Sequence, residues 1–182
     1  YCEIVSYRNC LEKIKEARPW GIIFTGGPAS VYEEGAPTLP KEIFEMGIPI
    51  LGICYGAQLM AHVLGGEVVS PDYKEYGKVK LNISRDSLLF RGIPTDEICW
   101  MSHTDYIKQV PEGFVFSSST ETCPTGSMEN PEKKLYAVQF HPEVHHTPFG
   151  QDLLKNFLFE ICGCEKNWTM SSFAKAKIQE IK

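Results

Sequence analysis

Short apolar runs alternate with helix-like segments in the first third of the chain. The run Ile50–Ile53 is apolar at nearly every position, as in a strand that is buried on both faces. The apolar residues that follow recur at helical spacing until Gly65 and Gly66, which end the predicted helix. Such an alternation of strands and helices is typical of a parallel sheet. The other elements predicted in this part are strands over Cys2–Tyr7 and Trp20–Phe24 and helices over Cys10–Ala17 and Pro40–Met46.

After Gly66 the pattern changes to a period of two. Val79, Leu81 and Ile83 alternate with polar residues, which predicts a strand with one solvated face. Apolar residues at helical spacing predict a last helix over Gln151–Cys162. Further short strands are predicted over Ile98–Met101, Phe114–Ser118, Gly126–Met128 and Leu135–Phe140. The whole pattern indicates an α/β fold with an open, mostly parallel sheet, flanking helices and an added antiparallel section.

Composition and charge narrow the class of protein. The chain has 182 residues, of which 43% are hydrophobic, and this fits one globular domain with a substantial core. The net charge of −5 and the scattered lysines argue against the basic surface that nucleic acids require, so we expect no nucleic-acid partner. No apolar run approaches about 18 residues and no signal peptide is visible. We therefore expect a soluble, cytoplasmic chain that binds no membrane.

The cysteines and histidines give no indication of a metal site. The seven cysteines are odd in number and irregular in spacing, which fits reduced thiols better than a disulfide framework. Cys162 and Cys164 do not form a C-x-x-C pair, and no histidine at ligand spacing accompanies them. Adjacent His145 and His146 are expected to point in different directions, and no third ligand is in view. We predict no metal.

One cysteine lies at the junction between a predicted strand and a predicted helix. Gly52 and Gly56 flank Cys54, and small neighbours of this kind let a strained turn hold a nucleophile clear of the backbone. The positive end of the following helix favours a thiolate at this position. A lone cysteine at a strand end is, however, more often a small buried apolar residue than a nucleophile. Cys54 alone therefore does not decide the function.

Two further strand ends carry groups that suit a nucleophilic cysteine. His141 follows the apolar strand 135–140, and Glu143 comes two residues later. Because sites gather at the carboxyl ends of parallel strands, a histidine base and an orienting carboxylate could meet Cys54 there. The glycine turn after Trp20–Phe24 would present backbone N–H groups, although it lacks the ending of a phosphate-binding loop. Each residue alone could be an ordinary solvated loop residue, but the coincidence favours a Cys-His-Glu triad.

Three motifs together resemble the class I glutamine amidotransferases of the triad type. They are Phe24–Pro28, Gly52–Gln58 and Val138–Glu143, and the resemblance runs from Tyr1 to about Thr169. It implies a flavodoxin-like sheet. Three other segments resemble the branch of the family whose ammonia converts xanthosine monophosphate (XMP) to GMP: Trp100–Asp105, Ser119–Pro124 and Cys164–Thr169.

The resemblance implies a role for each site residue. Cys54 would attack the carboxamide of glutamine and form a thioester, His141 would transfer protons, and Glu143 would hold the imidazole. The oxyanion would be bound by the backbone N–H groups of Gly27 and Tyr55. Glutamine hydrolysis would need no cofactor. The implied substrate contacts are Gln58, the backbone around Ser102 and His103, and Asp105 for the α-ammonium group.

The resemblance also predicts how the chain is divided. Residues 1–167 would form the amidotransferase domain, and residues 168–182 would be a linker and the start of an ATP pyrophosphatase domain. That partner domain, which would use ATP and Mg²⁺, lies in the same full-length protein or in a separate subunit. Family members begin with a strand and a helix upstream of the segment that starts here at Tyr1. We expect that the sequence begins late, because loss of a central strand would expose unpaired edges. A homodimer through that missing part stays open.

Other functions remain open from the residues alone. Within the same class, the chain could be the glutaminase of another synthase, such as anthranilate or carbamoyl phosphate synthase. From a different class, it could be a noncatalytic module that docks a synthetase. A γ-glutamyl peptidase would use a triad of the same kind but would need a cleft that admits a peptide.

Overall fold

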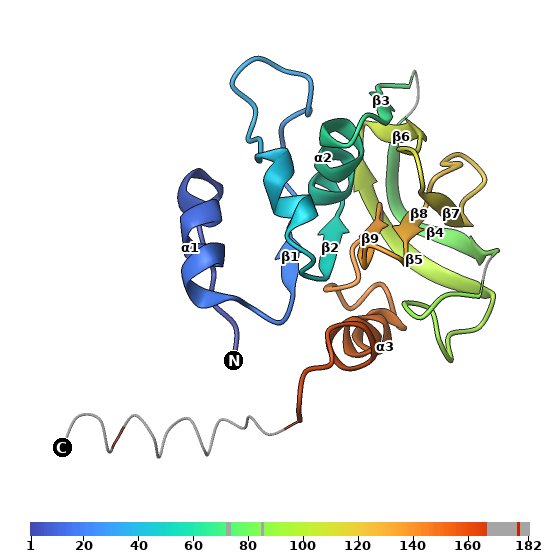
Figure 1. The fold of residues 1–182 in the computed structure, drawn as a ribbon. Helices are drawn as coiled ribbons and strands as arrows, with labels where there is room; N and C mark the ends of the chain where they lie inside the picture. Colours follow the sequence, from blue (N-terminus) through green and yellow to red (C-terminus); the bar gives the residue numbers. More distant parts are fainter. Residues whose placement is uncertain (72–73, 85, 167–177, 179–182) are drawn as a thin grey trace.

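The centre of the molecule is a mixed sheet with helices on both faces (Figure 1). The computed structural model describes residues 1–71, 74–84, 86–166 and 178. Among these residues, seven strands form one sheet in the order β1-β2-β9-β8-β7-β4-β5. The strands are β1 (Ile22–Phe24), β2 (Ile50–Ile53), β9 (Leu135–Val138), β8 (Ser127–Asn130), β7 (Val115–Ser119), β4 (Glu75–Ile83) and β5 (Asp96–His103).

The sheet has a parallel part and an antiparallel part. β1, β2 and β9 pair in parallel, and β8, β7, β4 and β5 continue the sheet in antiparallel order. The predicted α/β class and the added antiparallel section are confirmed. Parallel pairing is confined to β1, β2 and β9 among the described strands, so the antiparallel section is larger than the sequence pattern suggests. Two further strands, which were not predicted, form a small antiparallel sheet: β3 (Glu67–Val69) and β6 (Tyr106–Gln109).

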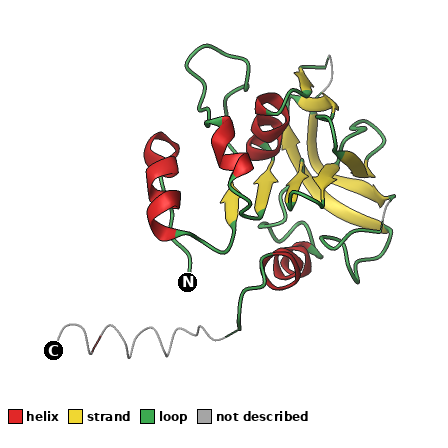
Figure 2. Cartoon of the chain, in the orientation of Figure 1, coloured by secondary structure: helices red, strands yellow, loops and turns green. Residues whose placement is uncertain are grey.

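Helices cover the two faces of the parallel strands (Figure 2). The helical elements are η1 (Tyr7–Asn9), α1 (Cys10–Ala17), η2 (Lys41–Glu45), α2 (Tyr55–Val63), α3 (Gly150–Lys155) and η3 (Asn156–Ile161). α1 has the predicted bounds. The predicted helix over 151–162 is α3 continued by the π-helical turn η3. None of the described helices has the length and apolar character needed to cross a membrane.

The alternation of side chains along β2 explains why its sequence is apolar throughout. Ile50 packs with α2 and η2 on one face, whereas Leu51 and Ile53 pack with α3 and η3 on the other. β9 alternates in the same way, with Ala137 on the first face and Val138 on the second. Both strands are buried along their whole length. Two layers of apolar packing therefore fix the carboxyl ends of β2 and β9.

The prediction of a strand over Cys2–Tyr7 is wrong. Residues 1–6 form no regular element, and all of them are exposed. An alternating pattern makes a strand only where a neighbouring strand accepts its hydrogen bonds, and no described strand pairs with this segment. The predicted linker over 168–182 lies, apart from Ile178, outside the described residues. β1 is the outer strand of the sheet among the described residues. The strand that the family resemblance implies upstream of Tyr1 stays a prediction.

Candidate active site

Cys54 occupies a strained turn between β2 and α2. Its φ of 52° and ψ of −107° are unusual for a residue with a side chain. A Cβ atom on Gly52 would lie 2.6 Å from the carbonyl oxygen of Gly56, and one on Gly56 would collide with the carbonyl oxygen of Phe24. Both flanking glycines are therefore required by close backbone packing. The turn predicted from the two glycines is present.

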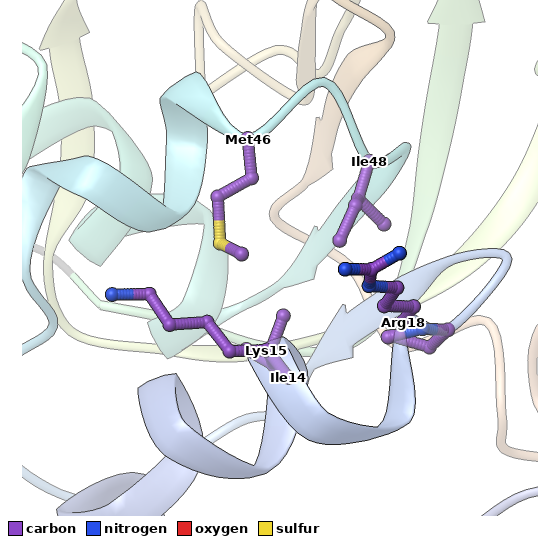
Figure 3. A pocket seen from close by; sticks show the side chains of 6 residues that line it. Ile14, Lys15, Arg18, Met46 and Ile48 are labelled. Atoms are coloured by element: carbon purple, nitrogen blue, oxygen red, sulfur yellow. The ribbon is translucent and has the colours of Figure 1, made fainter.

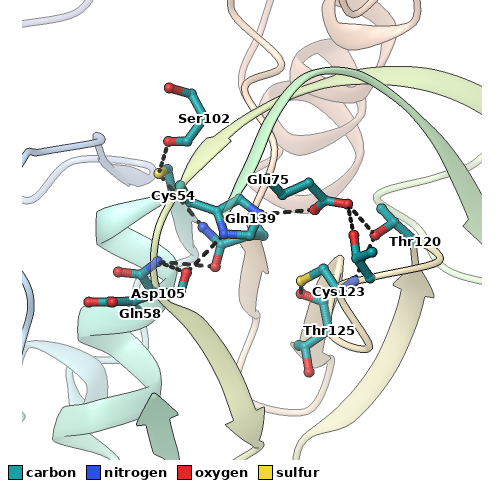
Figure 4. A network of polar contacts seen from close by, with 11 residues as sticks. Cys54, Gln58, Glu75, Ser102, Asp105, Thr120, Cys123, Thr125 and Gln139 are labelled. Carbon is teal, nitrogen blue, oxygen red and sulfur yellow. Dashed lines mark hydrogen bonds and ion pairs between the residues drawn. The ribbon is translucent and has the colours of Figure 1, made fainter. Parts of the chain in front are cut away.

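The sulfur of Cys54 lies in a small polar environment at the start of α2. The Sγ atom is 3.7 Å from the carbonyl oxygen of Ser102, and the Nε2 atom of Gln139 donates to it over the same distance (Figure 4). The backbone N–H of Cys54 donates to Val138 at 2.8 Å, which ties the turn to the end of β9. Cys54 is only 6% exposed. The thiol is thus held at one edge of the parallel strands.

His141 and Glu143 follow the same end of β9. The Nδ1 atom of His141 lies 2.7 Å from Oε1 of Glu143, which leaves Nε2 as the ring nitrogen available to the thiol. The His141 backbone is fixed as well, because its N–H donates to Trp100 and its carbonyl accepts from Thr147. A Cβ atom on Gly26 would lie 3.3 Å from Cε1 of His141 and 3.7 Å from Cβ of Cys54. The glycine turn therefore covers both residues.

Hydrogen bonds set the charges of this pair. Hydrogen bonding with Cys54 and then with Glu143 raises the pKa of His141 to about 10, although burial alone would lower it. Burial by itself would raise the pKa of the Glu143 carboxyl, but the hydrogen bond from His141 outweighs it and the pKa is lowered. At neutral pH the arrangement is an imidazolium between a sulfur and a carboxylate.

The glycine turn after β1 lies against the first turn of α2. A Cβ atom on Gly27 would be 3.5 Å from Cγ of Tyr55, so the two predicted oxyanion residues are neighbours. The hydroxyl of Tyr55 donates to the carbonyl of Pro37 at 2.5 Å. This bond fixes the loop after the glycine turn to α2, beside Cys54.

The predicted substrate residues lie on the other side of the sulfur. Gln58 is buried, and its Nε2 atom donates to the Asp105 carbonyl at 2.8 Å and to Oε1 of Gln139 at 3.2 Å. Asp105 is 4% exposed, and its carboxylate has no hydrogen-bond partner among the described residues. Ser102 contributes its carbonyl near the thiol, whereas the His103 side chain points away, toward Glu75.

Some residues of this region were not predicted. Gln139, which donates to the sulfur, lies two residues before His141, and in the strand that the sequence predicts over 135–140, continued to His141, positions two apart share a face. That spacing could have identified it. Glu75, His103 and Cys123 also bring together a carboxylate oxygen, a ring nitrogen and a sulfur within 4.8 Å of one another. No sequence motif joins these three, because they come from distant parts of the chain.

A pocket elsewhere in the molecule is unrelated to this site. It has a volume of about 480 Å³ and lies between α1 and the turn before β2 (Figure 3). Its lining consists of Ile14, Lys15, Arg18, Pro19, Met46 and Ile48. None of the predicted site residues contributes to it.

Comparison with known proteins defines the class. The family model for glutamine amidotransferase class-I matches residues 1–161, and the chain belongs to this family. Over all 182 residues it is 60% identical to the GMP synthase [glutamine-hydrolyzing] of Clostridium perfringens and 57% identical to that of Caldicellulosiruptor saccharolyticus. The chain spans 36% of the length of each of these relatives.

Solved structures agree with this assignment. A GMP synthase subunit from Thermoplasma acidophilum is 31% identical and superposes with a TM-score of 0.81, over 98% of this chain and 84% of that one. A glutamine amidotransferase from Thermotoga maritima, at 21% identity and a TM-score of 0.66, shares the fold. The family resemblance drawn from the motifs is confirmed.

Proposed function

We propose that this chain hydrolyses glutamine to glutamate and ammonia, with Cys54 as the nucleophile. The observation that carries the proposal is the position of His141, which is hydrogen-bonded to Glu143 through Nδ1 and interacts with Cys54. Other buried cysteines are poor candidates, because burial raises the pKa of the Cys99, Cys123 and Cys162 thiols to about 12.

The proposed reaction has two halves. The sulfur of Cys54 attacks the side-chain carboxamide carbon, and backbone N–H groups of Gly27 and Tyr55 stabilise the resulting oxyanion. The carbon–nitrogen bond then breaks, and His141 gives its proton to the departing ammonia, which leaves a glutamyl thioester. Neutral His141 next takes a proton from water, which attacks the thioester and releases glutamate and the thiolate. One oxyanion donor is worth about 100- to 1,000-fold in rate.

Free glutamine also needs partners for its charged α-groups. Asp105 is 4% exposed and lies on the segment that holds the Ser102 carbonyl near the thiol, and its carboxylate has the charge that suits the α-ammonium group. The backbone around Ser102 and His103 would bind the α-carboxylate. Gln58, one helical turn after Cys54, would complete the substrate pocket through its amide.

The ammonia would pass to a synthetase domain that converts XMP to GMP with ATP and Mg²⁺. Relatives named GMP synthase, of which this chain spans 36%, support this step. Residues 1–167 would be the amidotransferase domain, and 168–182 would lead into the synthetase domain. Glutamine hydrolysis itself would use no cofactor. Free cysteines throughout the described residues support a reducing, cytoplasmic location.

Glutamate release measured on Cys54→Ala tests the proposal. We expect activity to fall at least about 1,000-fold, since loss of the nucleophile removes the covalent route. Cys2→Ala is the matched control, because Cys2 is exposed and lies outside every helix and strand, and it should keep wild-type activity. Unchanged glutamate release by Cys54→Ala would contradict the mechanism. Inactivity of the wild-type chain, with and without its synthetase domain, would favour a noncatalytic docking module.

A further inference from the structure

A buried histidine–glutamate pair lies next to the loop that joins β5 to β6. Glu75 on β4 and His103 at the end of β5 are 8% and 7% exposed. The Nε2 atom of His103 is 3.1 Å from Oε2 of Glu75, and its Nδ1 atom is 3.0 Å from the carbonyl oxygen of Asp105. The other carboxylate oxygen of Glu75 accepts from Thr120 and Thr122 (Figure 4).

These contacts hold the His103 ring at both nitrogens. A backbone carbonyl can only accept, so Nδ1 of His103 must donate to Asp105. Nε2 then faces the carboxylate of Glu75. Burial would raise the pKa of Glu75, but hydrogen bonds from His103, Thr122 and Thr120 outweigh it and lower the pKa. Glu75 is therefore a charged partner for the ring, and the ring orientation is fixed from both sides.

The pair is connected to the thiol through the Asp105 carbonyl. That oxygen accepts both from His103 and from Gln58, the latter at 2.8 Å. Gln58 also donates to Gln139, and Gln139 donates to the sulfur of Cys54. The segment fixed in this way, from Ser102 near the end of β5 to Asp105 before β6, carries the Ser102 carbonyl and the Asp105 carboxylate.

We propose that Glu75 is a positioning residue for glutamine: it holds the His103 ring through Nε2, and His103 fixes the Ser102–Asp105 segment against Gln58 and Cys54. The proposal rests on the proposed function, since the segment is the one assigned to the α-groups of glutamine. Glu75 touches neither Cys54 nor His141 in any hydrogen bond of the described residues, so it acts through His103.

The alternative to a positioning role is a metal site, with Glu75, His103 and Cys123 as its ligands. The hydrogen bonds favour the positioning role. Both ring nitrogens of His103 and both oxygens of Glu75 are already engaged, and the Cys123 sulfur donates to the Thr125 carbonyl at 3.3 Å. Zinc bound by the purified chain in a one-to-one ratio, and lost in Cys123→Ser, would overturn the proposal.

Steady-state kinetics with glutamine test the positioning role. We expect Glu75→Ala to raise KM at least about tenfold, because the segment loses a charge-assisted hydrogen bond, while kcat falls less than about threefold. KM does not depend on the folded fraction, so a merely structural role would leave it unchanged. Glu75→Gln should keep KM within about threefold, since its amide can hydrogen-bond with Nε2 as donor or as acceptor. Glu160→Ala, which removes an exposed ion pair with Arg91, is the control and should match wild type.

Nitrogen-15 NMR of the histidine rings gives a second, independent readout. The Nε2 signal of His103 should change between wild type and Glu75→Gln, because the partner of that nitrogen changes, whereas Nδ1 should keep its proton in both. If Glu75→Ala does not fold, Glu75→Asp replaces it; the shorter side chain cannot reach the ring and should raise KM about threefold to tenfold. An unchanged KM, or an Nε2 signal of His103 that is the same in wild type and Glu75→Gln, would contradict the proposal. Absence of any glutamate release by the wild type would instead count against the proposed function, and the ring spectrum would still test the pair.

Discussion

At the residue scale, His141 carries the charge that the proposed reaction would use. It lies between a sulfur and a carboxylate, and both contacts favour its protonated form. Its side chain is 18% exposed, while that of Glu143 is 48% exposed, so solvent reaches the carboxylate more readily than the ring. A base that rests as an imidazolium can donate a proton to ammonia at once, and it needs no separate protonation step during acylation.

This charge predicts how stability depends on pH. The folded pKa of His141, about 10, lies above the ordinary value of 6.5. The stabilising contribution is therefore fully present below about pH 6.5 and is lost as the pH rises through 10. We expect the urea midpoint of the wild type to fall over this window more steeply than that of His141→Asn, which cannot titrate. Glu143→Gln, which removes one of the two contacts, should give an intermediate slope. Equal slopes in wild type and His141→Asn would contradict the assigned charge.

At the element scale, the β2–turn–α2 unit shows what a sequence can specify. The apolar run, the two glycines and the helical spacing are local signals, and each predicted its feature correctly. The strand predicted over Cys2–Tyr7 failed because alternation does not supply a partner strand. The Glu75–His103 contact could not be predicted for the same reason: it depends on the pairing of β4 with β5, in which Glu75 lies opposite His103.

The close packing of the turn predicts the effect of a single methyl group. In Gly56→Ala the new Cβ atom would collide with the carbonyl oxygen of Phe24, so β1 and α2 must separate. We expect a loss of about 1–3 kcal/mol in the free energy of unfolding and at least about a tenfold loss of glutaminase activity. Chemical denaturation and glutamate release measure the two effects.

Gly35→Ala provides the control for that substitution. Gly35 has a φ of 79° and open space around it, so alanine there strains the backbone without displacing the turn. We expect a stability cost of about 1–2 kcal/mol with activity unchanged. Full activity of Gly56→Ala, at a loss of stability similar to that of Gly35→Ala, would contradict this prediction. It would mean that β1 and α2 can separate without disturbing the site.

At the scale of the whole molecule, three parallel strands position the residues of the candidate site. β1, β2 and β9 run in the same direction and lead into the glycine turn, Cys54 and His141, respectively. The apolar layers on both faces hold these strand ends, and the antiparallel part adds the segment 102–105. The chain spans 36% of its GMP synthase relatives, so the partner that uses the ammonia would be the remaining synthetase part.

Reconstitution with a synthetase domain of GMP synthase tests that partnership. With XMP, ATP and Mg²⁺ present, we expect nitrogen from amide-labelled glutamine to appear in GMP, because ammonia released at Cys54 is passed on before it mixes with water. Cys54→Ala should abolish GMP formation from glutamine but keep it with added ammonium chloride, which bypasses the thiol. The synthase component of anthranilate synthase should give no amination under the same conditions. Amination of the acceptor substrate of that synthase instead of XMP would assign this chain to a different synthase, while leaving the Cys54 mechanism intact.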